Sequence, residues 1–174
     1  MPILTKRANK TPLGIYVHVP FCRSKCQYCD FYSVTEKEDR LLDRYLRAIC
    51  AHVKEAGALA PGYVVDTIYF GGGTPSYYGE KRLRELLSCI KKHYNVESDA
   101  EITMEANPDS LFDWKELRAL RRLGLNRISL GVQSSDDAVL RRLQLTQQEI
   151  LDEIVRICES NDIHYYLVGG TLLG

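Results

Sequence analysis

The stretch LGIYVHVPFCRSKCQYCDF, residues 13–31, decides the fold of this chain. Its first part, residues 13–20, is a short run rich in β-branched and aromatic side chains that a proline ends, a pattern typical of a β-strand. Three cysteines follow it closely, at Cys22, Cys26 and Cys29. The sequence therefore predicts a first strand with a cysteine-rich loop at its carboxyl end.

The spacing of these cysteines indicates an iron–sulfur cluster. Thiolate ligands suit both iron–sulfur clusters and zinc. A structural zinc site usually takes four ligands, often as two separated pairs, whereas the next cysteine, Cys50, lies far along the chain in a helical pattern. Three thiolates on one loop can instead hold three corners of a four-iron cluster and leave the fourth iron open for chemistry. We favour the cluster, and zinc bound by the same loop is the alternative.

A second strand ends in glycines. Residues 64–70 form an apolar, β-branched run that leads directly into Gly71-Gly72-Gly73-Thr74-Pro75. Between the two strands, apolar residues at helical spacing predict a helix over residues 36–55. A strand, a helix and a strand with its working loop at the carboxyl end are typical of parallel α/β folds.

The same alternation continues along the chain. Apolar spacing predicts a helix over residues 80–94, a strand over residues 101–105 and a further strand over residues 127–131. Asp113 and Glu116 form a capping box, which predicts that a third helix begins there. Gly124 is expected to close that helix.

Composition favours a catalyst of the cytoplasm. The 174 residues carry 23 Lys and Arg against 23 Asp and Glu, and zero net charge gives no indication of nucleic acid or an anionic membrane as a partner. No apolar run approaches the length of a membrane span, and residues 1–10 lack the apolar stretch of a signal peptide. The cysteines outside the loop occupy apolar helix positions, where free cysteine commonly packs as a small hydrophobic residue: Cys50, Cys89 and Cys158. This pattern is consistent with a reducing compartment.

Five motifs in order resemble the amino-terminal half of radical S-adenosylmethionine (SAM) enzymes, over residues 13–143. They are YVHVPFC, CxxxCxxC, GGGTP, EANP and SLGVQS, at residues 16–22, 22–29, 71–75, 105–108 and 129–134. More narrowly, the chain resembles the group of oxygen-independent coproporphyrinogen III oxidases and heme chaperones. Within that group, CQYCDF and MEANP look more like the heme chaperones.

The resemblance implies a [4Fe–4S] cluster on Cys22, Cys26 and Cys29, whose open iron takes the amino and carboxylate groups of SAM. An electron from the cluster would cleave SAM to methionine and a 5′-deoxyadenosyl radical, while the protein supplies positioning and electrostatics. Heme or a porphyrin is the implied partner, through heme trafficking or oxidative decarboxylation of coproporphyrinogen III. Contacts to SAM are implied for Tyr16, Tyr28, Gly72, Gly73, Thr74, Glu105 and Gln133.

Each of these contacts has a purely structural alternative. Tyr16 alone is also typical of a core aromatic, the glycines of a tight turn, Glu105 of a strand-end surface charge and Gln133 of a loop amide. We interpret His18 as structural and not as a ligand. Two tyrosines after the glycines are expected to pack within their loop, with a substrate contact as the alternative: Tyr77 and Tyr78.

The resemblance stops after residue 143. Residues 144–145 stand where the family has Gly-Arg, whose arginine helps to bind SAM. A helix with a capping box at Thr146 and Glu149, a strand and a glycine turn follow, and they resemble the start of the LicD phosphotransferase family. We expect a fusion of two unrelated gene starts near residue 143. No metal-binding carboxylates follow the glycine turn, so phosphotransfer is not expected.

The resulting prediction is an α/β fold, an incomplete parallel (β/α) half barrel of the radical SAM type with four to five strands. Its parts are a flexible amino terminus over 1–12, a truncated barrel over 13–143 and a helix–strand tail over 144–174. The alternative for the tail is a native continuation as fourth helix and fifth strand. In both cases its strand is expected to pair in parallel beside the fourth. Under the fusion hypothesis the chain is an inactive remnant, so its own activity is left open.

Overall fold

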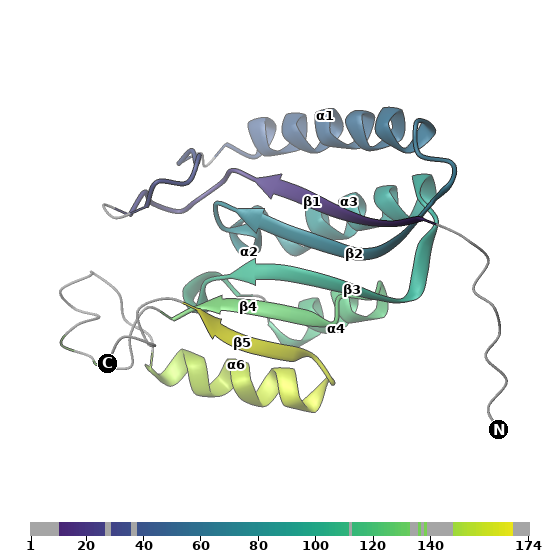
Figure 1. The fold of residues 1–174 in the computed structure, drawn as a ribbon. Coiled ribbons are helices and arrows are strands. Elements are labelled where there is room, and N and C mark those ends of the chain that lie inside the picture. Colours follow the sequence, from purple (N-terminus) through teal and green to yellow (C-terminus); the bar gives the residue numbers. More distant parts are fainter. Residues whose placement is uncertain are drawn as a thin grey trace, which may run out of the picture.

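A computed structural model describes residues 11–26, 29–35, 38–111, 113–132, 136, 138 and 148–168. Five strands form one sheet in the order β1-β2-β3-β4-β5, and each neighbouring pair is parallel (Figure 1). This sheet confirms the predicted parallel α/β fold. The strands are β1 (Thr11–Val19), β2 (Tyr63–Gly72), β3 (Val96–Ala106), β4 (Arg127–Gly131) and β5 (His164–Val168).

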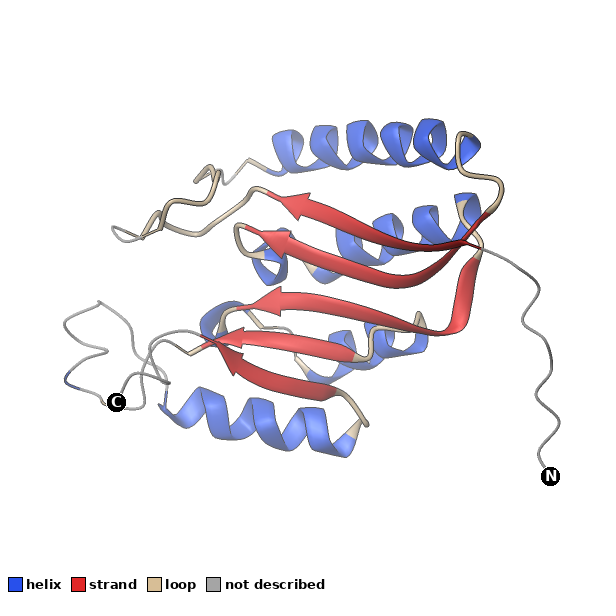
Figure 2. Cartoon of the chain, viewed as in Figure 1, coloured by secondary structure: helices blue, strands red, loops and turns tan. Residues whose placement is uncertain are grey.

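Helices connect the strands. Figure 1 shows α3 and α4 behind the sheet and α1 and α6 along its two edges, and Figure 2 shows all five strands pointing the same way. The carboxyl ends of the strands therefore meet at one edge of the sheet. The helices are α1 (Asp39–Ala58), α2 (Pro75–Tyr78), α3 (Glu80–His93), α4 (Trp114–Arg122) and α6 (Gln148–Ser160), with a 3-10 helix, η1 (Pro108–Ser110).

Most predicted elements are present, with shifted boundaries. The first helix begins at Asp39 and ends at Ala58, later at both ends than predicted. The capping box of α4 is confirmed, since the Asp113 carboxylate accepts from the Glu116 backbone N–H at 2.9 Å and the Glu116 carboxylate accepts from the Asp113 N–H at 3.0 Å. Gly124 follows with φ +109°, as a closing glycine should.

The third strand is longer than predicted. It begins at Val96, not at Glu101, although residues 97–99 are polar and disfavour a strand. Val96 pairs with Val65 of β2, and the register shifts before Thr67 meets Glu101. Pairing with the neighbouring strand therefore extends β3 beyond what its local pattern supports.

The two faces of the sheet differ in chemistry. Buried apolar side chains alternate with polar ones in the second halves of β1, β2 and β3 and along β4, and the helices cover the apolar face, which holds Val17, Val19, Ile68, Phe70, Ile102, Met104, Ile128 and Leu130. Parallel sheets are usually covered on both faces, and their strands then have continuous apolar sequences. This sheet is different, because one of its faces is polar and is available for a site. The polar face, as we name it, holds Tyr16, His18, Tyr69, Glu101, Thr103, Glu105, Arg127 and Ser129.

The tail continues the sheet. β5 pairs in parallel with β4, from Arg127 with His164 to Gly131 with Val168, as expected for either origin of the tail. Ile154, Cys158 and Ile163 are buried in the same core as the first four strands. The predicted capping box at residues 146–149 lies outside the residues whose side chains are described. The LicD resemblance remains a prediction.

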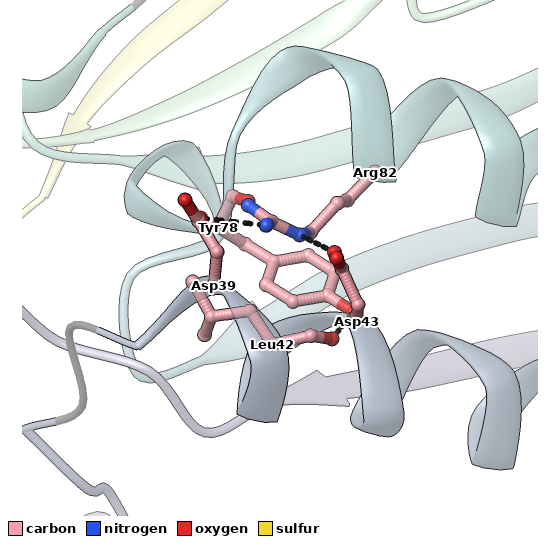
Figure 3. A network of polar contacts seen from close by, with 5 residues as sticks. All are labelled: Asp39, Leu42, Asp43, Tyr78 and Arg82. Atoms are coloured by element: carbon pink, nitrogen blue, oxygen red, sulfur yellow. Dashed lines mark hydrogen bonds and ion pairs between the residues drawn. The ribbon is translucent and has the colours of Figure 1, made fainter.

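A polar network fastens α3 to the start of α1. The Arg82 guanidinium lies 2.7 Å from a carboxylate oxygen of Asp39 and 2.7 Å from one of Asp43, and it also donates to the Tyr78 carbonyl at 3.3 Å (Figure 3). The Tyr78 hydroxyl donates to the Leu42 carbonyl at 3.0 Å. Because α1 begins where the cysteine-containing segment ends, this network fixes the far end of that segment.

None of the described helices combines the length and the apolar character that crossing a bilayer requires.

We predict that Arg82→Ala lowers the free energy of unfolding by about 1–2 kcal/mol, because this α3 side chain makes charged hydrogen bonds to two carboxylates of α1 and is only 18% exposed. Arg84→Ala is the matched control on the same helix. It loses one i,i+4 pair to Glu80, worth at most about 0.5 kcal/mol. Urea titrations followed by circular dichroism would measure both. Equal losses would contradict a special role for the network.

We also predict that Cys158 resists alkylation in the folded chain. Burial, and secondly the Glu159 charge, raise the pKa of this thiol to about 11. Compared with an ordinary value of 9.0, the thiolate fraction at pH 8 then falls about a hundredfold. Iodoacetamide labelling read by mass spectrometry, with the urea-unfolded chain as control, would measure this. Equal labelling in both states would mean that α6 does not pack on the sheet.

Candidate cofactor site

The cysteine-containing segment leaves the carboxyl end of β1 and returns to it. We call residues 20–38 the cysteine loop; residues 27–28 and 36–37 lie outside its described part. At its stem, the Cys22 N–H donates to the Val34 carbonyl at 3.1 Å and the Val34 N–H donates to the Pro20 carbonyl at 2.7 Å. This pair of bonds closes the loop directly beside Cys22, so Cys22 is fixed to the sheet.

Phe21 anchors the stem in the core. It is 2% exposed and stacks on Tyr78, with ring centroids 5.3 Å apart and planes at 10°. Tyr45 packs edge-on against Phe21 at 5.2 Å, and its hydroxyl donates to the His18 carbonyl. Burial is the main cause that raises the pKa of Tyr78 and of Tyr45, so both phenols stay neutral.

These contacts decide between the two expectations for Tyr78. The Tyr78 side chain, in α2, is fully buried and supports the stem of the cysteine loop through its stacking on Phe21. The predicted packing role of Tyr78 is therefore confirmed, although the residue lies in a short helix and not in a loop. The alternative, a direct substrate contact, is wrong because the side chain is fully buried. Tyr77 is half-buried against the same core.

The glycine turn after β2 clasps the start of the cysteine loop. The Gly73 N–H donates to the Val19 carbonyl at 2.8 Å, and the Thr74 N–H donates to the Phe21 carbonyl at 2.7 Å. A Cβ on Gly73 would lie 2.8 Å from that Phe21 oxygen. Glycine is thus required here by the chain's own packing, whatever else approaches the turn.

Gly72 is constrained twice. Its φ of +112° is a conformation that side chains other than glycine rarely adopt, and a Cβ would lie 2.6 Å from the His18 ring. The predicted approach of SAM to Gly72 and Gly73 is not tested by these contacts. They provide an additional, structural reason for the glycines.

Glu105 is held in place on the polar face. One carboxylate oxygen accepts from the Tyr69 hydroxyl at 2.7 Å, and the other accepts from the Gly72 N–H at 3.2 Å. The strand-end surface charge proposed as an alternative does not describe this half-buried, doubly bonded group. The carboxylate therefore stands at a defined point beside the glycine turn.

A histidine links Tyr16 to the cysteine loop. His18 Nε2 lies 3.0 Å from the Tyr32 carbonyl, which can only accept, so Nε2 carries the proton. Nδ1 then accepts from the Tyr16 hydroxyl at 2.9 Å. The structural interpretation of His18 agrees with these contacts, and the bonded partners specify which part of the site it connects.

Tyr16 is not a core aromatic. Its side chain is 59% exposed, and its ring stacks on Tyr69 with centroids 6.2 Å apart. Partial burial of the phenol, and secondly the charge of Glu105, raise the pKa of Tyr16. Sequence reasoning missed Tyr69, although the period of two along β2 places it on the same face as Gly71.

Two of the predicted SAM contacts, Tyr28 and Gln133, lie outside the described residues. The other five lie along the carboxyl edge and polar face of the sheet, in β1 and β3, at the end of β2 and in the turn after it: Tyr16, Gly72, Gly73, Thr74 and Glu105.

All six cysteines belong to the described part of the chain and are free thiols. The three in the loop, Cys22, Cys26 and Cys29, are half-buried, and the Cys29 N–H donates to the Cys26 carbonyl at 3.2 Å. Within the described ranges, no three His, Cys, Asp or Glu side chains gather around one point, as a single metal ion would need. A four-iron cluster instead takes each thiolate on a separate iron, and the three half-buried thiols of the loop offer sulfur ligands of the kind it needs.

Comparisons with known proteins agree with this donor set. The family model of the radical SAM superfamily matches residues 16–173. That match includes the segment after residue 143, where the sequence alone suggested a junction. The chain is 43% identical over 135 residues to the heme chaperone HemW of Mycobacterium tuberculosis strain H37Rv, which covers 76% of this chain and 34% of the relative.

Two further relatives come from Escherichia coli K12. Heme chaperone HemW is 40% identical over 132 residues (76% of this chain, 35% of the relative). Oxygen-independent coproporphyrinogen III oxidase is 32% identical over 143 residues (82% of this chain, 31% of the relative). The chain thus spans about a third of the length of these curated relatives.

The fold has counterparts among solved structures. Coproporphyrinogen III oxidase (HemN) from Escherichia coli, described as a radical SAM enzyme, superposes with a TM-score of 0.84 at 27% identity, over 93% of this chain and 38% of that one. The protein anSMEcpe with bound AdoMet shares the fold with a TM-score of 0.62 at 16% identity, over 91% of this chain and 43% of that one.

Proposed function

We propose, because this chain belongs to the radical SAM superfamily, that its cysteine loop holds a [4Fe–4S] cluster through Cys22, Cys26 and Cys29 and that SAM binds beside it. The observation that carries this proposal is the position of Cys22. Its backbone is bonded to Val34 at the carboxyl end of β1, next to the glycine turn. When bound, the cluster and SAM supply reductive cleavage of the SAM sulfonium.

The chain's own residues would bind and orient SAM. Glu105 offers a fixed carboxylate near the glycine turn, and its negative charge complements the positive sulfonium of SAM. Tyr16 offers an exposed ring on the same face. Tyr28 and Gln133 complete the proposed contacts from the loop and from the segment after β4, together with Gly72, Gly73 and Thr74.

We further propose a heme-related role for this chain, which spans about a third of the length of its curated relatives. Identity to the heme chaperones exceeds identity to the oxidase, 43% against 32%, which favours trafficking of heme over oxidation of coproporphyrinogen III. Cys26-Gln27-Tyr28-Cys29-Asp30-Phe31 supports the same choice. A half-exposed cluster loop and six free thiols favour the reducing cytoplasm as its location.

We predict that anaerobic reconstitution with iron and sulfide gives about four irons per chain. Electron paramagnetic resonance (EPR) of the reduced sample should show a four-iron signal that changes when SAM is added. Cys22→Ala should lose the signal, because one iron loses its thiolate. Cys50→Ala, a cysteine outside the loop, is the control and should retain it. A chain that takes up zinc but forms no cluster would contradict the proposal.

We also predict that Glu105→Gln weakens SAM binding about tenfold, or about 1.4 kcal/mol, because the amide loses the complementary charge. Equilibrium dialysis with radiolabelled SAM would measure the affinity, and EPR would verify that the cluster is intact. Glu101→Gln is the matched control on β3, since that carboxylate already pairs with Arg127 at 2.8 Å. An affinity that falls equally in both variants would contradict a specific role for Glu105.

A further inference from the structure

We infer that Thr74 donates a hydrogen bond from its hydroxyl to the sulfur of Cys22 and thereby raises the reduction potential of the cluster. The inference rests on the proposed function, since it concerns a thiolate that is bound to iron. It gives Thr74 a role distinct from the SAM contact that the family resemblance implies. Thr74 is a positioning and tuning residue in this account, because it acts through Cys22.

The geometry places donor and acceptor together. Thr74 Oγ1 lies 3.5 Å from Cys22 Sγ, within the range of a hydrogen bond to sulfur. The Thr74 side chain is 6% exposed, so water does not compete freely for its hydroxyl. A buried hydroxyl needs a partner, and the Cys22 sulfur is the acceptor that faces it.

The Thr74 hydroxyl does not cap the helix that follows it, although Thr74 stands at the N-cap position. Thr74 is the N-cap of α2, and N-cap threonines usually accept from the backbone N–H groups of the first turn. Here the side chain makes no such bond. The Thr74 backbone carbonyl accepts from the Tyr77 N–H at 2.9 Å, as an N-cap carbonyl does. The bond to Cys22 is therefore the one that orients this hydroxyl.

Both partners are held by backbone bonds. The Thr74 N–H is bonded to the Phe21 carbonyl at 2.7 Å, and the Cys22 N–H is bonded to the Val34 carbonyl at 3.1 Å. The aromatic packing of Phe21 on Tyr78 fixes the same segment from the core side. The separation of hydroxyl and sulfur is thus set by the sheet and not by the outer part of the loop.

The sign of the effect follows from charge. One-electron reduction adds a negative charge to the cluster and its thiolates, and the electron comes from an external reductant. A hydrogen-bond donor near sulfur stabilises the more negative state to a greater extent, so it raises the reduction potential. Removing the hydroxyl should lower that potential.

The test is a potentiometric titration of the reconstituted full chain, followed by EPR of the reduced cluster and performed without SAM. Thr74→Val removes the hydroxyl and keeps the shape, and Thr74→Ser keeps the hydroxyl. At the wild-type midpoint potential, the ratio of reduced to oxidised cluster should fall about threefold to tenfold in Thr74→Val, where tenfold equals 59 mV for one electron. Thr74→Ser should stay close to wild type.

Ser76→Ala is the control, because it removes another buried hydroxyl of α2 that bonds to Ser110 and not to Cys22. Its midpoint should equal that of wild type. Thr74→Ala is measured beside Thr74→Val, so that the result does not depend on accommodating the valine methyl group.

Each outcome decides the inference. A lower midpoint in Thr74→Val and Thr74→Ala, with Thr74→Ser and Ser76→Ala unchanged, supports it. Midpoints that are equal in all variants overturn the role of Thr74 while the cluster stands. The same shift in Thr74→Ser would assign the effect to shape and overturn the hydrogen bond. A wild-type chain without any cluster overturns the proposed function, and this inference with it.

Discussion

Backbone hydrogen bonds that extend beyond the ends of β1 and β2 determine where the cysteine loop can lie. The parallel pairing of these strands reaches His18 with Gly71 and Val19 with Gly72, and it passes into the bonds from Gly73 to Val19 and from Thr74 to Phe21. The glycine turn and the loop stem therefore form one rigid unit. The sulfur of Cys22, the Thr74 hydroxyl and the Glu105 carboxylate all take their positions from that unit.

The division of the sheet into two faces explains how a small structure provides both stability and a site. Helices bury the apolar face, where Ile68, Met104 and Leu130 supply the core. On the other face, several polar groups are bonded to a neighbour on the next strand or turn, as Tyr69 is to Glu105 and Arg127 is to Glu101. These cross-strand bonds keep the polar side chains ordered without a covering layer of helices.

Short-range rules predicted much of this arrangement from sequence. The capping box at Asp113, the strand that Pro20 ends and the glycine turn all depend on residues close together in the chain. The bond between Tyr69 and Glu105 joins residues 36 positions apart, and only the strand register brings them together. The stacking of Phe21 on Tyr78 and the extension of β3 to Val96 likewise depend on neighbouring elements. No local pattern contains that information.

The close contact between Gly72 and His18 makes the two positions unequal in mutational tolerance. A smaller residue at position 18 would remove the steric conflict with a side chain at position 72, but the positive φ of Gly72 would still disfavour any side chain there. Gly72 is therefore restricted by both backbone and packing, whereas His18 is restricted by its hydrogen bonds and by its ring contacts with Tyr16 and Tyr32. During evolution, the residue at position 18 can therefore change while position 72 remains glycine. A side chain at position 72 stays unfavourable, whether or not position 18 has changed first.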